Sequence, residues 1–566
     1  MEFCNIARPL AQNATRVPFR PAIVFPAGRD KKGRAQFTQL SFQQLNEECD
    51  RYAHGLYAYG VRKGDRTLML VRPGPEFIAV VFALLKIGAV PVMIDPGMGI
   101  KPFLQCVTET EPVNFIGLAL AHALRKLFPK PFKTVQRSVT VGEKWVTKLA
   151  VWDSVPLDQV RAARNDPFPV AATTREDEAA VAFTSGSTGI PKGVVFTHGL
   201  FQAQIDLLHD EIGYTDGDVD LPGLYIFALY NPALGVTTII PDMDPSKTAE
   251  LNPAYLVEAI QTHGVTVSFG SPTVWKIVGT YCREKGIKLP SLKRILMAGA
   301  PVHPSLIRAY AGGTPDDILP NGDVYTPFGA TEALPITMMS GKEILQETAA
   351  LSEQGRGMCV GRPTTGNTIR IIDISDDPIP EWDDSLVRPD GEVGEIVVKG
   401  PVVTRTYLNR PQKTAQAKIR EKSSQGETEI WHRMGDLGYF DDTGRLWFCG
   451  RKAHRIETAD GLVLPVPCEA IFNLHPDVLR TALVGVGKPG KQEPVLIVEP
   501  KAGSTPTTAE AKHKLIAGLL KLGAQYEQTR CIQTVLFHPS FPVDVRHNAK
   551  IQREKLAPWA EERVKG

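Results

Sequence analysis

The sequence predicts an α/β protein with a large N-terminal domain and a small C-terminal one. The chain has 566 residues, which is too long for a single hydrophobic core. Strand and helix patterns alternate through its first three quarters, which is typical of mostly parallel sheets flanked by helices. From about Gly391 the pattern changes to short strands separated by glycine turns, which indicates a β-barrel or meander.

The most apolar stretch of the chain, Phe77–Asp95, is predicted to be buried inside the protein rather than in a membrane. It reads FIAVVFALLKIGAVPVMID and is nearly long enough to span a bilayer, but Lys86, Gly88 and Pro91 interrupt it. With TLMLVR and the turn PGPE before it, the stretch gives a strand, a helix that ends at Ile87 and a second strand. This pattern predicts one βαβ unit that is buried on both faces.

Further strands and helices follow in alternation. The strand AAVAF precedes the segment TSGSTGIPKG at Thr184–Gly193, and the strand GVVFT follows it and leads into a helix over HGLFQAQIDLLHDEIG. The segment LVEAIQTHGVTVSFGSP then gives a helix, a glycine stop and a strand, and LKRILMAGAPV gives a strand that ends in a glycine turn. We therefore place Thr184–Gly193 on a loop between two strands.

The domain boundary is predicted at Gly450–His454, where the short-strand pattern ends. This divides the chain into an N-terminal domain over 1–450, with its barrel-like part at about 391–450, and a C-terminal domain over 451–566. The C-terminal domain carries a mixed helix and strand pattern. The polar segment Ile419–Glu429 has few apolar residues and is predicted to be a surface loop.

Composition and charge exclude several classes of protein. Lys and Arg total 64 against 62 acidic residues, so no overall positive field would hold a nucleic acid. The eight cysteines are scattered and form no C-x-x-C pair, which argues against a zinc or redox motif and fits a reducing cytoplasm. The first residues lack an apolar core of signal-peptide length. We therefore expect a cytoplasmic protein without a nucleic-acid partner.

The loop TSGSTGIPKG has the composition of a site for a polyphosphate. Its glycines allow backbone N–H groups to face inward as an anion-binding nest, its hydroxyl side chains add donors, and Lys192 adds a positive charge. It is not a Walker A loop, because Pro191 precedes the lysine and Gly193 follows it. A flexible loop would explain the glycines and serines, but not the lysine between flanking strands. The sequence therefore favours phosphate binding.

Six motifs in the same order resemble those of the adenylate-forming superfamily, which includes acyl-CoA synthetases, adenylation domains of peptide synthetases and firefly luciferase. The first is the TSGSTGIPKG loop. The others are AGAP, YTPFGATE, GEVGEIVVKGPVVTRTYLNRP, RMGDLGYFDDTGRLWFCGRKAHR and RHNAKIQREKL. The resemblance covers nearly the whole chain. It implies a large N-terminal domain of two mostly parallel, helix-flanked sheets and a distorted β-barrel, with a small, mobile C-terminal α+β domain.

The resemblance also implies a reaction, in which a carboxylate attacks the α-phosphate of ATP and expels pyrophosphate. Two anions must approach each other, so positive charge must lie between them, and Mg²⁺ is the usual solution. Thr184 and Glu332 would hold the Mg²⁺ ion. A capping or salt-bridge role is the simpler alternative for Glu332, but its place directly after Gly-x-Thr favours the metal site.

The remaining motif residues would bind the nucleotide. Asp436 would accept hydrogen bonds from both ribose hydroxyls, since a carboxylate offers two acceptors, and Phe328 would stack on adenine unless it only packs in the core. Lys550, in place of a merely solvated lysine, would reach the α-phosphate and the substrate carboxylate. The predicted catalytic residues are Lys550, Thr184, Glu332 and Lys192. The predicted nucleotide-binding residues are Thr184, Ser185, Gly186, Ser187, Thr188, Gly189, Lys192, Gly299, Ala300, Pro301, Phe328, Gly329, Thr331, Asp436 and Arg451.

Two departures from the superfamily pattern concern the hinge and the acyl pocket. Ala453 stands two residues after the arginine of the GR motif, where relatives often carry Asp or Lys at the hinge for domain rotation. This leaves thioester formation with CoA an open question. Phe227, Ala228 and Ala330 are predicted to line the acyl pocket, with Ala228 in the place of a histidine.

The segments YTPFGATEALPI and GRKAHRIETADG are most similar to the β-lactone synthetases of bacterial long-chain olefin biosynthesis, one group of the superfamily. This resemblance implies a long-chain 2-alkyl-3-hydroxy acid whose hydroxyl attacks the acyl-adenylate and closes a β-lactone. It also implies other olefin-pathway enzymes as partners, namely a ketone reductase and a β-lactone decarboxylase. Two alternatives remain: a long-chain fatty acid–CoA ligase, and a nucleotide- or acyl-binding protein without catalysis.

A basic segment, Leu124–Lys148, stands apart from these motifs. It has seven Lys or Arg against one acidic residue, with Phe128, Phe132 and Trp145 between them. An ordinary solvated face is the simplest interpretation. The alternative is a surface that contacts a membrane or a partner enzyme and receives an apolar substrate there.

Overall fold

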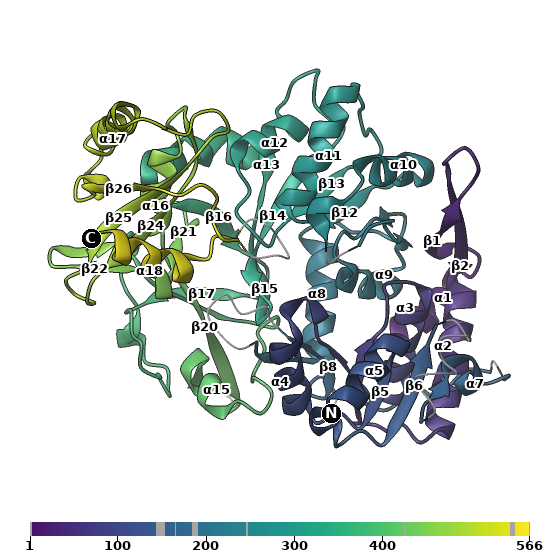
Figure 1. Ribbon diagram of the computed structural model, residues 1–566. Coiled ribbons are helices and arrows are strands. Elements are labelled where there is room, and N and C mark those ends of the chain that lie inside the picture. The colour runs from purple at the N-terminus through teal and green to yellow at the C-terminus, as the bar shows by residue number, and fades with distance from the viewer. Residues whose placement is uncertain are drawn as a thin grey trace.

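Two large sheets with helices on their faces make up most of the protein, and a smaller unit follows at the C-terminus (Figure 1). This computed structural model confirms the predicted fold class, including the barrel-like region and the small α+β part. The structure describes residues 3–142, 153–164, 166–183, 191–244, 247–423, 426–543 and 550–564.

The first sheet has seven strands in the order β7-β6-β5-β3-β4-β8-β9. The neighbouring pairs are parallel except for β8 and β9, which run antiparallel on either side of the predicted phosphate loop. The strands are β3 (Arg66–Leu70), β4 (Val90–Met93), β5 (Asn114–Leu118), β6 (Arg137–Val141), β7 (Val155–Pro156), β8 (Glu178–Phe183) and β9 (Gly193–Thr197).

Helices cover both faces of this sheet. Apolar side chains of α2 (Phe42–Ala58) and α3 (Pro75–Ile87) pack in one core cluster with one face. Those of α4 (Ile100–Thr110), joined at the edge by α5 (Ala119–Leu127), pack against the other. Strand β3 shows the division, because Leu68 belongs to the second cluster while its neighbour Met69 belongs to the first.

The apolar run after β3 forms the predicted βαβ unit. Helix α3 lies between the parallel neighbours β3 and β4, and its side chains from Phe77 to Ile87 are all buried. Lys86 is among them, and its Nζ lies 2.5 Å from Asp50 Oδ1 and donates to Asn46 Oδ1 at 2.8 Å. The charge that interrupts the run is thus paired inside the protein. Within the described ranges, no helix has the length and apolarity needed to cross a bilayer.

The second sheet combines a parallel half and an antiparallel half. Its path is β17-β18-β20-β21-β16-β15-β14-β13-β12-β10-β11-β1-β2, with β19 beside β20. Pairs from β14 to β1 along this path are parallel, and the others are antiparallel. The strands are β1 (Pro21–Arg29), β2 (Ala35–Ser41), β10 (Val219–Asp220), β11 (Thr237–Ile239), β12 (Val267–Gly270), β13 (Arg294–Met297), β14 (Asp323–Ala330), β15 (Ala333–Ser340), β16 (Met358–Pro363), β17 (Thr368–Ile372), β18 (Gly394–Lys399), β19 (Lys418–Lys422), β20 (Thr428–Phe440) and β21 (Leu446–Arg451).

The two sheets share a core. Side chains of α8 (His198–Asp210) pack in the same cluster as α2 and α3, while α10 (Pro253–His263), α11 (Pro272–Lys285) and α12 (Pro304–Ala311) cover the second sheet's other face. The Thr197 hydroxyl accepts from the N–H of Leu200 at the start of α8 and fixes the chain's entry into this helix. Further helices are α1 (Arg8–Arg16), α7 (Leu157–Val160), α9 (Asn231–Leu234), α13 (Gly341–Glu343), α14 (Ala349–Leu351) and α15 (Pro411–Ala417).

The antiparallel half contains the barrel-like region. Two features of this region differ from what the sequence predicts. Strands β16 and β17 already belong to it, so it begins before residue 391. The segment Ile419–Glu429, predicted to be a surface loop, instead supplies most of β19 and the start of β20. That prediction was wrong because cross-strand contacts stabilise polar strands: Lys399 pairs with Glu421 at 2.6 Å and with Glu429 at 2.7 Å.

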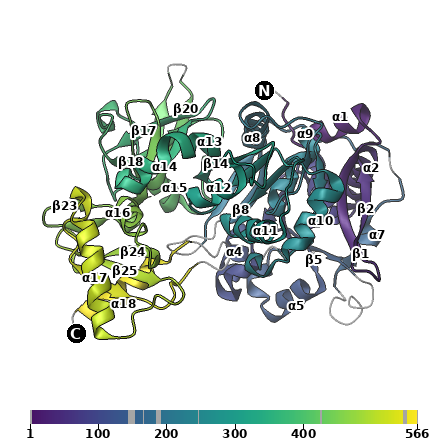
Figure 2. The same cartoon turned by 90° about the horizontal axis from the view of Figure 1, so that it is seen from above.

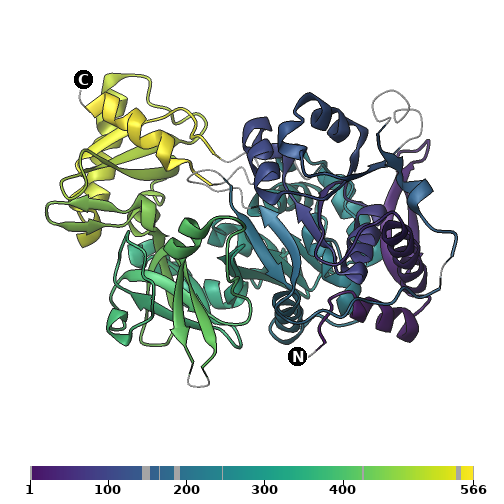
Figure 3. The ribbon, with the colours of Figure 1, turned by 90° about the horizontal axis from the view of Figure 1, so that it is seen from below.

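The C-terminal unit has its own three-stranded sheet in the order β24-β25-β26. It lies at one end of the molecule beside the barrel-like region, in yellow and green in Figures 2 and 3, and the purple N-terminal strands lie at the other end. Its elements are β22 (Ile456–Thr458), β23 (Gly461–Val463), α16 (Pro465–Phe472), β24 (Val478–Val486), β25 (Glu493–Pro500), α17 (Ala509–Gly523), β26 (Thr534–Phe537) and α18 (Arg553–Val564).

The linker that enters this unit is held against the barrel-like region by charged side chains. Lys452 Nζ donates to the carbonyl of Ser375 at 2.6 Å and lies 3.1 Å from the buried carboxylate of Glu395. Arg455 Nη2 lies 2.5 Å from Asp376 Oδ2. We call these contacts the linker clamp.

Candidate active site

Two groups of predicted nucleotide-binding residues, Gly299–Pro301 and Phe328–Thr331, lie at one edge of the second sheet. Strands β12, β13 and β14 are parallel and in register, so their carboxyl ends meet at this edge. The turn Gly299–Pro301 follows β13, and Phe328–Glu332 lies at the end of β14. Ligands of open α/β sheets bind outside the carboxyl ends of the strands, which makes this edge the candidate site.

A tight turn places Glu332 at this edge. Thr331 and Glu332 form the two-residue connection between β14 and β15, in which Ala330 pairs with Ala333. Gly329 just before it has φ +158°, and a Cβ there would lie 2.3 Å from the carbonyl oxygen of Ala333. Only glycine permits this close approach of the two strands. The glycine of the motif therefore sets the position of the carboxylate that follows it.

Glu332 and Lys192 meet through a tyrosine that the sequence motifs did not single out. The Tyr407 hydroxyl donates to Glu332 Oε1 at 2.5 Å and accepts from Lys192 Nζ at 3.1 Å. Lys192 Nζ itself lies 3.8 Å from Glu332 Oε1. Burial lowers the pKa of Lys192, while Glu332 opposes that shift. Burial and the neighbouring Glu332 raise the pKa of Tyr407, so its hydroxyl keeps the proton that it donates.

Asp436 and Arg451 are paired residues on β20 and β21. Arg451 Nε lies 3.2 Å from Asp436 Oδ1, but Oδ1 has no hydrogen-bond partner among the described residues although it is buried. Burial raises the pKa of Asp436 to about 6, and the positive charges of Arg451 and Lys550 oppose the shift. A buried, charged oxygen without a donor fits a ligand that supplies hydroxyl groups.

Lys550 comes into this group from the C-terminal unit. Its positive charge opposes the rise in the pKa of Asp436, as does that of Arg451, whereas the negative charge of Glu332 adds to it, so Lys550 lies within electrostatic range of Asp436. Arg553, three residues later, holds the start of α18 through hydrogen bonds to the buried Glu469 at 2.5 Å and 3.2 Å. This ion pair positions the segment that presents Lys550.

The predicted acyl-pocket residues divide between two environments. Phe227 stacks on Phe269, at the end of β12, with ring centroids 4.0 Å apart, and so lies at the same sheet edge. Ala228 is buried in the core cluster shared by the two sheets. Ala330 and Phe328 pack at the margin of the barrel core, and the Phe328 ring tilts against Phe448 at 5.6 Å. The structure thus shows packing for Phe328, which leaves its stacking on adenine a prediction.

The phosphate loop lies largely outside the described residues. This applies to the predicted site residues Thr184, Ser185, Gly186, Ser187, Thr188 and Gly189, whose roles remain predictions. Lys192, at the start of the next described range, is the loop residue whose contacts the structure gives.

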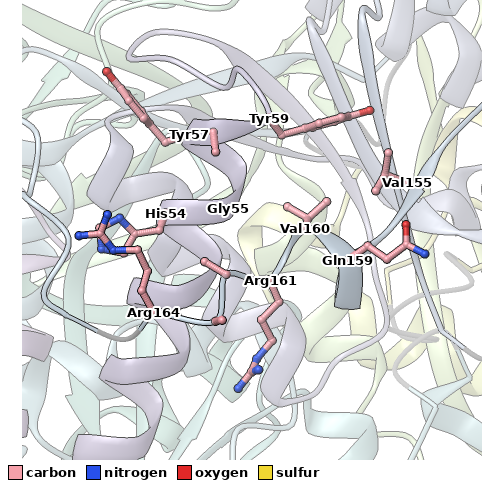
Figure 4. A pocket seen from close by; sticks show the side chains of 12 residues that line it. His54, Gly55, Tyr57, Tyr59, Val155, Gln159, Val160, Arg161 and Arg164 are labelled. Atoms are coloured by element: carbon pink, nitrogen blue, oxygen red, sulfur yellow. The ribbon is translucent and has the colours of Figure 1, made fainter.

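Of two cavities in the described part of the chain, one lies apart from this group and the other borders it. The one in Figure 4 measures about 630 Å³ and lies between α2 and the segment at residues 155–164, with His54, Tyr59 and Arg161 among its lining residues. None of the predicted site residues lines it. A second cavity, of about 530 Å³, has Tyr407 and Lys418 in its wall.

Comparison with known proteins identifies the class to which this fold and site belong. The model of the AMP-binding enzyme family matches residues 10–408. The chain therefore belongs to the AMP-binding enzyme family, the adenylate-forming enzymes, and is an ATP-dependent ligase-type enzyme.

Relatives within the family differ in their similarity. The chain is 45% identical over 559 residues to an olefin beta-lactone synthetase of Xanthomonas campestris pv. campestris, which covers 98% of this chain and 97% of the relative. It is also 45% identical to an enzyme of the same name from Stenotrophomonas maltophilia, with 98% of each covered. A long-chain-fatty-acid–CoA ligase of Thermus thermophilus is 27% identical, with 85% of each chain covered.

Solved structures support the fold. The anthranilate CoA ligase AuaEII in complex with anthranoyl-AMP superposes with a TM-score of 0.77 over 100% of this chain and 98% of that one, at 18% identity. At 18% identity, this similarity is evidence for the fold only.

Proposed function

We propose that the enzyme adenylates a long-chain 2-alkyl-3-hydroxy fatty acid and then closes a β-lactone by internal attack of the 3-hydroxyl. The observation that carries this proposal is the 45% identity over nearly the whole chain to olefin beta-lactone synthetases, against 27% to a long-chain fatty acid–CoA ligase. The difference extends beyond the shared motifs, because 98% of the chain is covered.

The first step brings a carboxylate to a phosphate, and the chain's cations would reduce the repulsion. Lys192 and Arg451 act on each other electrostatically, and Lys550 acts on Asp436 next to them. Lys192 lies 3.8 Å from Glu332 and Arg451 lies 3.2 Å from Asp436, and these contacts support a cationic site for the two anions. Fixed charges of this kind stabilise the negative charge that develops as the carboxylate oxygen bonds to the α-phosphorus and pyrophosphate leaves.

Glu332 fits a role in holding Mg²⁺. Its side chain is buried, with 7% of the residue exposed. In proteins, Mg²⁺ usually binds one or two carboxylates together with oxygens of the substrate phosphates. No group of three or more His, Cys, Asp or Glu side chains suited to a metal occurs in the part of the chain that the structure describes, which fits an ion shared with the nucleotide. With Thr184 as the second predicted ligand, bound Mg²⁺ would neutralise phosphate charge.

Different residues would hold the ribose and the adenine of the nucleotide. The carboxylate of Asp436 would accept hydrogen bonds from both ribose hydroxyls, and its Oδ1, which has no hydrogen-bond donor among the described residues, supports this role. The turn Gly299–Pro301 would form a wall beside adenine. Phe328 would lie against the ring face.

The second step needs no further cofactor. The 3-hydroxyl oxygen bonds to the carbonyl carbon of the acyl-adenylate, its proton is lost, and AMP leaves with the electrons of the acyl–phosphate bond. An intramolecular nucleophile held near attack geometry has an effective concentration of roughly 10⁵ M or more. This favours lactone closure over transfer to a second substrate.

Product analysis tests the proposal. The enzyme is given ATP, Mg²⁺ and a 2-alkyl-3-hydroxy acid, with and without CoA, and the lipid and nucleotide products are identified. We expect β-lactone, AMP and pyrophosphate in both mixtures. A thioester formed only with CoA would instead support the fatty acid–CoA ligase. Bound nucleotide with neither product would support a binding protein without catalysis.

Pathway partners follow from the chemistry of this substrate and product. A 3-hydroxy acid with a 2-alkyl branch is the product of a ketone reductase, and a β-lactone loses CO₂ to give an olefin in a β-lactone decarboxylase. We place the enzyme between these two activities. All eight cysteines are free in the structure, which suits the reducing cytoplasm in which we place the pathway.

The predicted basic surface would receive the apolar substrate. Leu120 and Leu127, seven residues apart on α5, are 82% and 72% exposed, and Lys130 and Lys133 are exposed nearby. Residues 143–148 of the predicted segment lie outside the described ranges. Apolar and cationic side chains on one surface suit an anionic bilayer.

Charge reversal tests this surface. We expect Lys130→Glu with Lys133→Glu to reduce sedimentation with vesicles rich in anionic phospholipid, because each lysine near such a surface contributes about 1 kcal/mol. Neutral vesicles and the Lys31→Glu with Lys32→Glu variant serve as controls. Equal sedimentation of the charge-reversed and parent proteins would exclude a membrane role for this surface.

A further inference from the structure

Two lysines are buried among the described residues, and their environments differ. Lys86 lies beside a carboxylate, Asp50, as expected for a buried ammonium. Lys418, at the start of β19, is 5% exposed and has no carboxylate within ion-pair distance among the described residues. The structure therefore explains the burial of Lys86 but leaves that of Lys418 to be explained.

Neutral oxygens of one residue hold the Lys418 ammonium. Its Nζ donates to the main-chain carbonyl of Thr404 and, at 3.2 Å, to the Thr404 hydroxyl. Both acceptors lie fourteen positions away along the chain, on the segment that leads to Tyr407. The ammonium thus fixes both the backbone and the side chain of Thr404.

Thr404 in turn holds the main chain of Glu332. Its N–H donates to the Glu332 carbonyl at 2.9 Å, and its hydroxyl donates to the same oxygen at 3.1 Å. The hydroxyl therefore accepts from Lys418 and donates to Glu332. The bridge between Ala333 and Val403 extends this contact by one residue on each strand.

Charged groups around Lys418 also connect it with the candidate site. Glu332 favours its protonated form, while Lys192 opposes it, and burial lowers its pKa to about 7. His432 on β20 lies opposite Lys418 in the sheet and is buried. Burial lowers the pKa of His432 well below its ordinary value, so it adds no second positive charge. Glu332 is thus the negative group whose charge favours the protonated form of Lys418.

A buried ammonium with only neutral acceptors is costly for folding. Replacing buried charges by apolar side chains of similar volume is often neutral or stabilising. A methionine at position 418 would fill the same space without that cost. A role in function, rather than in stability, accounts for a lysine here.

We propose that Lys418 is a positioning residue for Glu332, which it holds in place through Thr404. The inference rests on the proposed function for the role of Glu332 toward Mg²⁺ and the nucleotide. It makes the Lys418–Thr404–Glu332 connection a support for the main chain of Glu332, in addition to the contacts of the Glu332 carboxylate with Tyr407 and Lys192.

Nucleotide affinity with and without Mg²⁺ tests this proposal directly. Calorimetry gives the affinity of the parent and of Lys418→Met for ATP in Mg²⁺ and in EDTA. We expect the Mg²⁺-dependent affinity of Lys418→Met to fall about 10- to 100-fold, as happens when residues that orient a metal ligand are changed. Affinity in EDTA should stay the same, because the ribose and adenine contacts are unchanged.

Controls separate positioning from a general effect on the fold. Lys422→Met, an exposed lysine on the same strand, should behave as the parent. Lys418→Arg, which keeps the donors, should recover part of the loss. If Lys418→Met does not fold, Thr404→Val removes the hydroxyl part of the link by a smaller change and should show a smaller loss that is also selective for Mg²⁺.

Two outcomes would overturn the proposal: equal affinities for parent and Lys418→Met in Mg²⁺, or an equal fall with and without Mg²⁺ together with a lower Tm. The binding measurement does not use the fatty acid. A parent enzyme that binds MgATP but makes no lactone would therefore refute the proposed function and still report on Lys418.

Discussion

Replacement of Lys550 by alanine is expected to reduce the rate of acyl-adenylate formation about 100- to 1,000-fold, with much less effect on folding. The magnitude is typical for removing one donor that stabilises developing negative charge. Lys550 is the cation that the C-terminal unit brings next to Asp436. The measurement is exchange of labelled pyrophosphate into ATP in the presence of a 3-hydroxy fatty acid.

Lys555→Ala is the matched control, because Lys555 lies five residues further along and is exposed on α18. It should retain the parent rate. If Lys550→Ala exchanges pyrophosphate as fast as the parent, Lys550 has no part in adenylation.

Asp436→Asn is expected to make the unliganded protein more stable at neutral pH and to weaken nucleotide binding. Burial raises the pKa of Asp436 from 3.8 to about 6, so its charged form costs on the order of 3 kcal/mol in the folded state. Asparagine removes that charge. It also loses one acceptor for the ribose, and a hydrogen bond to a charged group contributes about 1.5–3 kcal/mol, or roughly 10- to 100-fold in affinity.

The pH dependence of this effect has a definite sign. Between about pH 4 and pH 6 the folded state keeps a proton on Asp436 that the unfolded chain has lost, so this carboxyl's contribution to stability falls as pH rises. The gain in Tm from Asp436→Asn should be full at pH 7.5 and nearly absent at pH 4. Calorimetric melting of the two proteins at both pH values is the measurement. An equal or lower Tm for the variant at pH 7.5 would contradict the prediction.

The βαβ unit and the helix of residues 198–210 could be predicted because apolar periodicity along a short stretch determines them. In the unit around Phe77–Asp95, Lys86 interrupts the apolar run but is still buried, because it pairs with Asp50 on the adjacent helix. The hairpin around Ile419–Glu429 could not be predicted, because its polar residues pair with Lys399, which is distant in sequence.

The candidate site was predictable only where a motif contains the residue. Asp436 lies beside Arg451 and Glu332 lies beside Lys192, all four of them motif residues, and their functional roles remain proposals. Tyr407 lies within the quoted segment TRTYLNRP, but a tyrosine in a strand pattern gives no sign of a carboxylate partner 75 residues away. Lys418 gave no signal at all, because a lysine in a polar segment is usually exposed.

The linker clamp would resist a rotation of the C-terminal unit relative to the rest of the enzyme. If the C-terminal unit rotated about Ala453, the contacts of Lys452 with Glu395 and of Arg455 with Asp376 would have to break and then form again. A ligase that must admit a separate thiol has to repeat this exchange in every cycle. A substrate that carries its own nucleophile can react in the conformation in which it was adenylated. For such an enzyme, a linker held by ion pairs would not lower the turnover rate.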